Sequence, residues 1–180
     1  MADILNDVMF VDTADNMAGI TKTAFIAFVS SFTTIAKPIA VPVKMEDKVL
    51  IGTPHVLKAG EKVRKVFVMY EKSGIESPMV GSRKAMSWKP KLKLMYCGTD
   101  AQILAFVSGI MQGDLIAWAT PMDGVGLIQI GTEELPASVV AGSVKTGEGP
   151  EGEKGVTFEI EAPSRQAWYI YTSPLPTAAV

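Results

Sequence analysis

Few side chains in this sequence have the type and spacing that catalysis or metal binding requires. Cys97 is the one cysteine and His55 the one histidine among 180 residues. One cysteine cannot form an internal disulfide, and two such residues are too few for a structural zinc site. We expect Cys97, which follows an aliphatic run, to be a small buried apolar group, and His55, which follows Pro54, to have a surface or packing role.

Two further patterns have the form of functional motifs. Residues 147–152 match G-x-G-x-x-G, but a dinucleotide site needs a strand before this pattern and a helix after it. Here Glu148 and Glu151 would repel phosphate, so the segment is interpreted as a loop. The neighbours Glu133 and Glu134 would point to opposite faces of a strand, which favours a solvated turn over acid–base catalysis. The sequence therefore predicts no enzyme, no cofactor and no metal site.

Charge is distributed unevenly along the chain. Residues 1–98 hold 14 bases and 9 acids, whereas residues 99–180 hold 3 bases and 10 acids. The net charge of −2 excludes a generally basic nucleic-acid binder. Opposite charges on one chain suit contacts between unlike surfaces of identical copies.

A basic segment and an acidic segment are the candidates for such a contact. The basic one carries five bases and no acid, at Arg83, Lys84, Lys89, Lys91 and Lys93. The acidic one carries Glu148, Glu151 and Glu153. With Trp88 and Tyr96 nearby, the basic segment also has the composition of a single-stranded nucleic-acid site or of an ordinary solubilising loop.

Strand patterns dominate the elements that must position these residues. The expected fold is mainly β: a β-sandwich or barrel of seven or eight strands with one flanking helix at about 100–112. The helix begins at the cap Thr99-Asp100 and carries an apolar stripe. Extended segments or strands are expected at 19–38, 41–51, 62–70, 91–96, 115–119, 125–130, 156–160 and 167–172.

The predicted organisation is an N-terminal arm (1–20) and a single domain (21–180). Within the domain, residues 71–90 are expected to form a long loop or extended hairpin, and residues 142–155 a Gly-rich loop. The apolar run at 24–29 is too short to span a bilayer, and the first 16 residues contain four aspartates and no base. We therefore expect no membrane insertion.

The order of these segments resembles the major tail tube proteins of tailed bacteriophages. The resemblance is carried by Asp15-Asn16-Met17-Ala18-Gly19-Ile20 after the acidic arm and by the run from Leu127 to Ala137. It is also carried by the run from Thr146 to Glu161, which is similar to the "TG…G…F" ending of phage structural proteins. The apolar, proline-bearing C-terminus departs from that family.

The resemblance implies a structural subunit without catalytic residues. Six copies would form a ring whose strands join a continuous inner barrel, and rings would stack into a hollow tube with a long loop reaching the next ring. The tube would enclose a tape-measure protein, contact other tail proteins and let double-stranded DNA pass without sequence-specific binding, in a virion tail assembled in the host cytoplasm. In that family the lumen often bears acidic side chains.

Two alternatives stay open from the residues. One is a capsid decoration protein or another self-assembling virion protein. The other is a ligand-binding β-sandwich or barrel, in which aromatic residues would line a pocket; these are Trp88, Trp118, Trp168, Tyr169 and Tyr171. A strand that carries adjacent aromatics alternates its faces, so one set of them should belong to the core.

Overall fold

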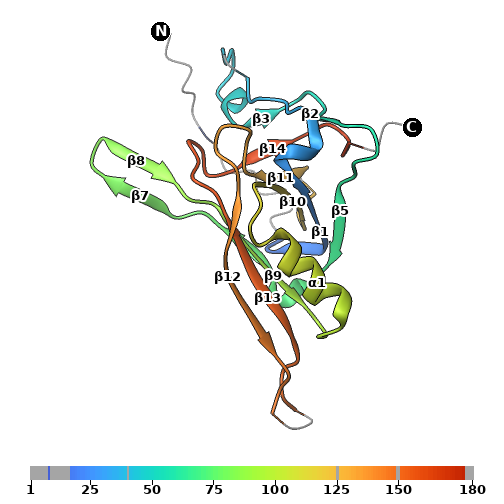
Figure 1. Ribbon diagram of the computed structural model, residues 1–180. Coiled ribbons are helices and arrows are strands. Elements are labelled where there is room, and N and C mark those ends of the chain that lie inside the picture. The colour runs from blue at the N-terminus through green and yellow to red at the C-terminus, as the bar shows by residue number, and fades with distance from the viewer. Residues whose placement is uncertain (1–7, 9–16, 40, 125, 149–150, 177–180) are drawn as a thin grey trace.

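Two stacked β-sheets form the body of the molecule in the computed structural model (Figure 1). The structure describes residue 8 and residues 17–39, 41–124, 126–148 and 151–176. Within these ranges lie fourteen strands, one α-helix and three short 3-10 helices. The mainly-β fold with one helix that the sequence predicts is confirmed. The larger number of strands comes from short strands of two to four residues, which carry too little periodicity to be recognised.

The first sheet has six strands in the order β3-β14-β11-β10-β1-β5. All neighbours are antiparallel except β14 and β3. Its central strand β10 is buried at every residue but Thr120, because both faces of the sheet are covered. The strands are β1 (Ile20–Phe28), β3 (Leu50–Ile51), β5 (Arg64–Phe67), β10 (Leu115–Pro121), β11 (Leu127–Ile130) and β14 (Tyr169–Tyr171).

The second sheet has four antiparallel strands in the order β12-β13-β9-β6. Strands β9 and β13 alternate over most of their length: Leu92 and Phe158 belong to the core, whereas Lys93 and Glu159 form a cross-strand pair on the other face. One face of this sheet is therefore dry and the other is charged. The strands are β6 (Gly74–Glu76), β9 (Lys91–Tyr96), β12 (Ser138–Lys145) and β13 (Gly155–Glu161).

The main core lies between the two sheets, and helix α1 (Ala101–Ile110) packs against it. Asp100 caps the helix, since its carboxylate accepts a hydrogen bond from the backbone N–H of Ile103 (3.1 Å). The predicted helix is confirmed. Its stripe is narrower than expected, because Ile103 and Ile110 are buried while Leu104 and Met111 are exposed.

A second core covers the opposite face of the six-stranded sheet. Strands β2 (Phe32–Thr34) and β4 (Val56–Leu57) pair with each other there. Their aromatic and aliphatic side chains pack on Trp118 of β10 and Tyr171 of β14, both almost fully buried. The 3-10 helix η1 (Val29–Ser31) directly precedes β2, and η2 (Glu46–Lys48) lies between β2 and β4 in the sequence.

A buried polar cluster fastens this second core to the sheet. Nδ1 of His55 accepts the backbone N–H of Ala36 (2.8 Å), so Nε2 carries the proton and donates to Oε1 of Gln129 (2.8 Å). The same oxygen accepts from Nε1 of Trp118 (2.9 Å), and the imidazole stacks on the ring of Tyr171. Burial lowers the pKa of His55, and the Gln129 hydrogen bond opposes this effect. Of the surface or packing role expected for His55, packing is the one found, since the side chain is buried.

A two-stranded hairpin projects from the body (Figure 1). It consists of β7 (Met79–Ser82) and β8 (Ala85–Trp88), and η3 (Tyr70–Lys72) and β6 precede it. Reciprocal backbone hydrogen bonds between Trp88 and Ser164 (2.9 and 2.8 Å) fix its base. Of the segment 71–90, for which a long loop or extended hairpin was expected, residues 79–88 form this hairpin, whereas residues 71–72 and 74–76 belong to η3 and β6.

Several local predictions are wrong. Residues 41–51 are not a strand: the Asp47 carboxylate accepts the N–H groups of Val43 and Lys44 (both 2.9 Å), which makes a turn before η2 and leaves only β3 extended. The extended segment at 19–38 is interrupted by η1.

Two further differences concern strand ends. The predicted loop at 142–155 is shorter, because β12 continues to Lys145 opposite Gly155 of β13. Cys97 is exposed instead of buried. Strand β9 ends one residue earlier, and Gly98 turns the chain with a φ of +128°. Among the described residues, no helix is long and apolar enough to cross a bilayer.

Candidate functional site

The β7–β8 hairpin is an exposed surface with an apolar character. All residues from 78 to 87 are exposed, including Met79 and Met86, which are 57% and 50% accessible. Its tip carries Arg83 and Lys84, and Lys84 adopts a left-handed conformation (φ 68°). An arm that presents both methionines and cations to solvent is suited to dock on another molecule.

Strand β12 is an exposed edge of the four-stranded sheet. Only β13 pairs with it, and every residue from Ala141 to Lys145 is exposed. In the described part of the chain, no backbone group of these residues bonds to anything but β13. No charged side chain interrupts the strand from Ser138 to Val144. Such an edge is a template for pairing with a further strand. A register shift between Val139 and Ala141 distorts its beginning only.

The structure separates the basic residues that were predicted to contact another copy. Arg83 and Lys84 lie at the hairpin tip, without an ion pair to any described residue. Lys89 and Lys91 form ion pairs with Glu161 within the chain, and Lys91 also approaches Glu76 and Glu159. Lys93 lies on the charged outer face of β9.

The acidic candidates are grouped in the connection between β12 and β13. Glu148 and Glu151 are exposed there. Glu153 accepts a hydrogen bond from the ammonium of Lys72 (2.6 Å), which lowers the pKa of that carboxyl. Three of the eight predicted contact residues (Lys89, Lys91 and Glu153) thus have opposite charges within their own subunit.

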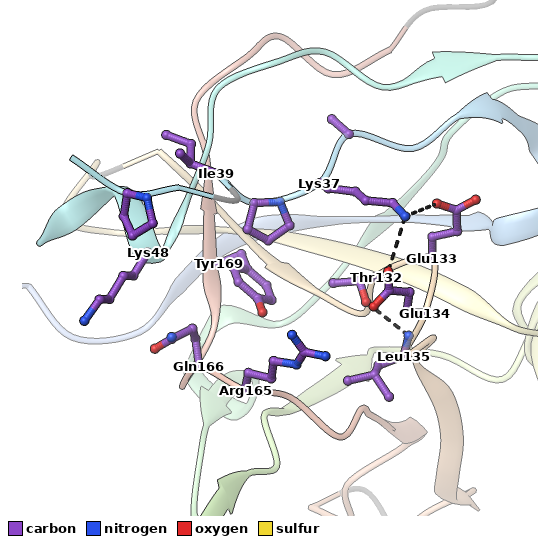
Figure 2. A pocket seen from close by; sticks show the side chains of 13 residues that line it. Lys37, Ile39, Lys48, Thr132, Glu133, Glu134, Leu135, Arg165, Gln166 and Tyr169 are labelled. Carbon is purple, nitrogen blue, oxygen red and sulfur yellow. Dashed lines mark hydrogen bonds and ion pairs between the residues drawn. The ribbon is translucent and has the colours of Figure 1, made fainter. Parts of the chain in front are cut away.

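A cleft of about 440 Å³ opens beside the second core (Figure 2). Three parts of the chain that are far apart in the sequence form it: residues 36–39 with 42 and 48, residues 132–135, and residues 165, 166 and 169. Figure 2 shows Tyr169 between the segment that carries Lys37 and Ile39 and the segment that carries Arg165. The wall is part apolar and part charged, with Ala36, Pro38, Ile39, Pro42 and Leu135 beside Lys37, Lys48, Glu133, Glu134 and Arg165.

Charges are unevenly compensated in this cleft. The ammonium of Lys37 contacts Glu133 (3.4 Å) and Glu134 (3.3 Å), and the hydrogen bond to Glu134 is the main reason that the pKa of Lys37 is raised. Glu133 and Glu134 lie in an exposed turn, as expected. Their carboxylates nevertheless converge on the same ammonium group, that of Lys37. Lys48 and Arg165 have no ion pair with any described residue.

The aromatic residues considered for a ligand pocket do not gather in one cavity. Trp118 and Tyr171 are buried in the second core, and Tyr169 is the one of the five that lines the cleft. No group of three or more His, Cys, Asp or Glu side chains in the described residues is arranged to hold a metal ion. The sequence did not indicate the cleft, because non-local contacts bring its three segments together.

Strand β12 carried a local signal that the sequence interpretation missed. The run from Ser138 to Val144 consists of small and β-branched residues without charge, and Gly142 led to its second half being interpreted as a loop. No known protein family, no curated protein and no solved structure matches this chain.

Proposed function

We propose that this chain is a structural subunit that assembles with identical copies into rings and a hollow tube, in the manner of the phage tail tube proteins it resembles. The observation that carries the proposal is the presence of two different unpartnered surfaces on one subunit. These are the edge strand β12 and the projecting β7–β8 hairpin.

A tube requires two kinds of contact between its subunits. One contact closes a ring, and the other repeats along the axis without closing. Strand β12 supports the first kind, since its eight residues offer about 27 Å of free edge at 3.4 Å per residue. The hairpin supports the second kind, because it carries exposed methionines away from the body.

The partners of the tube follow from the resemblance and belong to the same proposal. They are a tape-measure protein and other tail proteins, with DNA passing through the lumen. The cleft favours the rival function of a ligand-binding module, because it combines concavity with a few convergent polar groups.

Negative-stain electron microscopy with light scattering tests the proposal. The wild-type protein should form rings or tubes at high concentration. Ser143→Lys places a charge on the edge strand and should prevent ring formation, while Ser108→Lys on the exposed face of α1 is the matched control and should not. Met86→Glu on the hairpin should leave rings intact but reduce their stacking into tubes.

Two results would overturn the proposal. One is a wild-type protein that stays monomeric at every concentration and ionic strength. The other is Ser143→Lys protein that assembles as readily as the Ser108→Lys control. Monomers that bind a small molecule in the cleft would support the ligand-binding module instead.

A further inference from the structure

We propose that the cleft binds the acidic N-terminal segment of a second copy of this chain. The acidic segment is defined as residues 3–15, and the cleft is the one described above, which Lys48, Arg165 and Tyr169 help to line. The inference rests on the self-assembly proposed above and assigns to it a third contact, separate from the edge strand and the hairpin.

The cleft has the chemistry that an acidic, apolar peptide needs. Its apolar wall includes Pro38 and Ile39, and Tyr169 presents its ring between the two sides (Figure 2). Lys48 and Arg165 supply cations that no described acid neutralises. Lys48 lies at the other end of the cleft from Glu133 and Glu134, so an acidic peptide on that side would avoid both carboxylates (Figure 2).

The acidic segment has the complementary composition. It contains four aspartates and no base, with aliphatic and aromatic side chains between them. The aspartates are Asp3, Asp7, Asp12 and Asp15, and the side chains between them include Ile4, Leu5, Val8, Met9, Phe10 and Val11. Residues 17–98 hold 14 bases and 5 acids, so the segment is the acidic part of an otherwise basic half of the chain.

The topology places the cleft and the start of β1 at opposite ends of the six-stranded sheet. Strand β1 begins at Ile20, beside Pro121 at the end of β10. Strand β11 runs in the same direction as β1, because both are antiparallel to β10, and it ends at Ile130, just before the cleft turn at 132–135. The chain therefore enters β1 at the end of the sheet remote from the cleft of the same subunit.

This arrangement favours binding between copies. In a head-to-tail stack, the end at which β1 begins would face the cleft end of the next subunit. A segment of 13 residues spans up to about 45 Å when extended, which is longer than β10, whose seven residues extend roughly 23 Å. The segment is therefore long enough to reach the cleft of a neighbouring subunit, and the mixing experiment below separates this contact from one within the same subunit.

A peptide-binding measurement on the full chain tests the chemistry. A fluorescent peptide of residues 3–15 should bind, as read by anisotropy, and a peptide with all four aspartates changed to asparagine should bind about tenfold more weakly. Arg165→Glu and Lys48→Glu should weaken binding of the acidic peptide. Lys62→Glu, an exposed cation outside the cleft, is the matched control and should not.

A mixing experiment tests whether the contact forms between copies. One variant carries Arg165→Glu, and the other carries lysine in place of all four aspartates of the segment (Asp3, Asp7, Asp12 and Asp15), which reverses its charge. Each variant should assemble poorly alone, and the mixture should regain assembly. In the mixture, the acidic segment of the first variant meets the basic cleft of the second, and the basic segment of the second meets the acidic cleft of the first. Recovery would support the proposal, whereas mixtures that assemble no better than either variant alone would overturn it and indicate binding within one subunit.

The outcomes separate this inference from the assembly proposal. If wild-type tubes form while the peptide does not bind, or while neither charge reversal affects assembly, the cleft contact is refuted and the tube subunit stands. If the peptide binds a protein that never assembles, the tube subunit is refuted, and the cleft is confirmed as a site for the acidic segment.

Discussion

Replacing Gln129 with leucine should destabilise the second core strongly. This side chain is fully buried and accepts hydrogen bonds from His55 and Trp118 through one oxygen. Its amide nitrogen donates to the carbonyl of Gly131 (3.0 Å). Leucine fills a similar volume but can make none of these three bonds. Two N–H donors and one carbonyl would therefore lose their partners inside the protein.

The expected loss follows from these three groups. Each buried polar group left without a partner costs about 1–3 kcal/mol, and the added apolar surface of leucine returns roughly 1–2 kcal/mol. Three such groups sum to about 3–9 kcal/mol, so the free energy of unfolding should fall by about 1–8 kcal/mol, with a central value of about 4–5 kcal/mol, a large share of the roughly 5–15 kcal/mol that stabilises a typical domain. For a chain of this length, the central value corresponds to a Tm lowered by about 10–20 °C.

Chemical denaturation with tryptophan fluorescence and far-UV circular dichroism measures this change. Gln102→Leu is the matched control, because Gln102 is exposed on α1 and its replacement should alter stability by less than about 0.5 kcal/mol. If Gln129→Leu also changed stability by less than about 1 kcal/mol, the hydrogen-bonded cluster would not be what fastens the second core to the sheet.

Two further predictions concern the same part of the fold. Burial holds the pKa of folded His55 below the value of about 6.5 in an unfolded chain, so stability should be full above pH 6.5. The free energy of unfolding should fall as the pH drops from 6.5 toward the pKa of folded His55, by at most about 1.4 kcal/mol per pH unit. Urea titrations of the wild type and of His55→Gln measure this change, and parallel pH profiles would contradict it. Gly131→Ala should cost about 2 kcal/mol more than Gly60→Ala. Both glycines have positive φ (+89° and +81°), but a Cβ at 131 would lie 2.7 Å from the carbonyl oxygen of Leu115, whereas at 60 nothing lies within 4 Å. Thermal denaturation compares the two, and equal losses would refute the steric argument.

The sequence predicted those elements whose signals are local. The alternation Lys-Leu-Lys-Leu marked β9, and the cap at Asp100 with its apolar stripe marked α1. The prediction failed where a short-range hydrogen bond outweighed β propensity, as at Asp47. It also failed at residues 142–145, where pairing with β13 holds Gly142 in a strand despite its low propensity.

The candidate sites depend on contacts that a single sequence does not encode locally. Tyr169 was recognised as an aromatic strand residue, but apart from Arg165 and Gln166 the residues that line the cleft with it lie more than 30 positions away. The hydrogen bond between His55 and Gln129 likewise spans 74 positions. The exposed hairpin was predicted in part. The sequence showed its turn and glycine signals, but not that it projects from the body.

The contrast between the basic and acidic halves of the chain finds its main explanation inside one subunit. Among the described residues, Lys37, Lys72, Lys89 and Lys91 of the first half all pair with glutamates of the second half. On β9 and β13 this follows from register, since Lys91 lies opposite Glu161. The polarity is therefore weak evidence for contact between copies.

Self-assembly is instead supported by surfaces that have no partner within the described part of the subunit. Strand β12 leaves backbone groups free along its edge, and the hairpin leaves apolar side chains exposed. Charge supports the proposed cleft contact through Arg165 and Lys48, which lack acidic partners in the described chain, and through the four aspartates that precede β1. Salt should accordingly weaken the cleft contact much more than the pairing of edge strands, because screening acts on exposed ions and not on backbone hydrogen bonds.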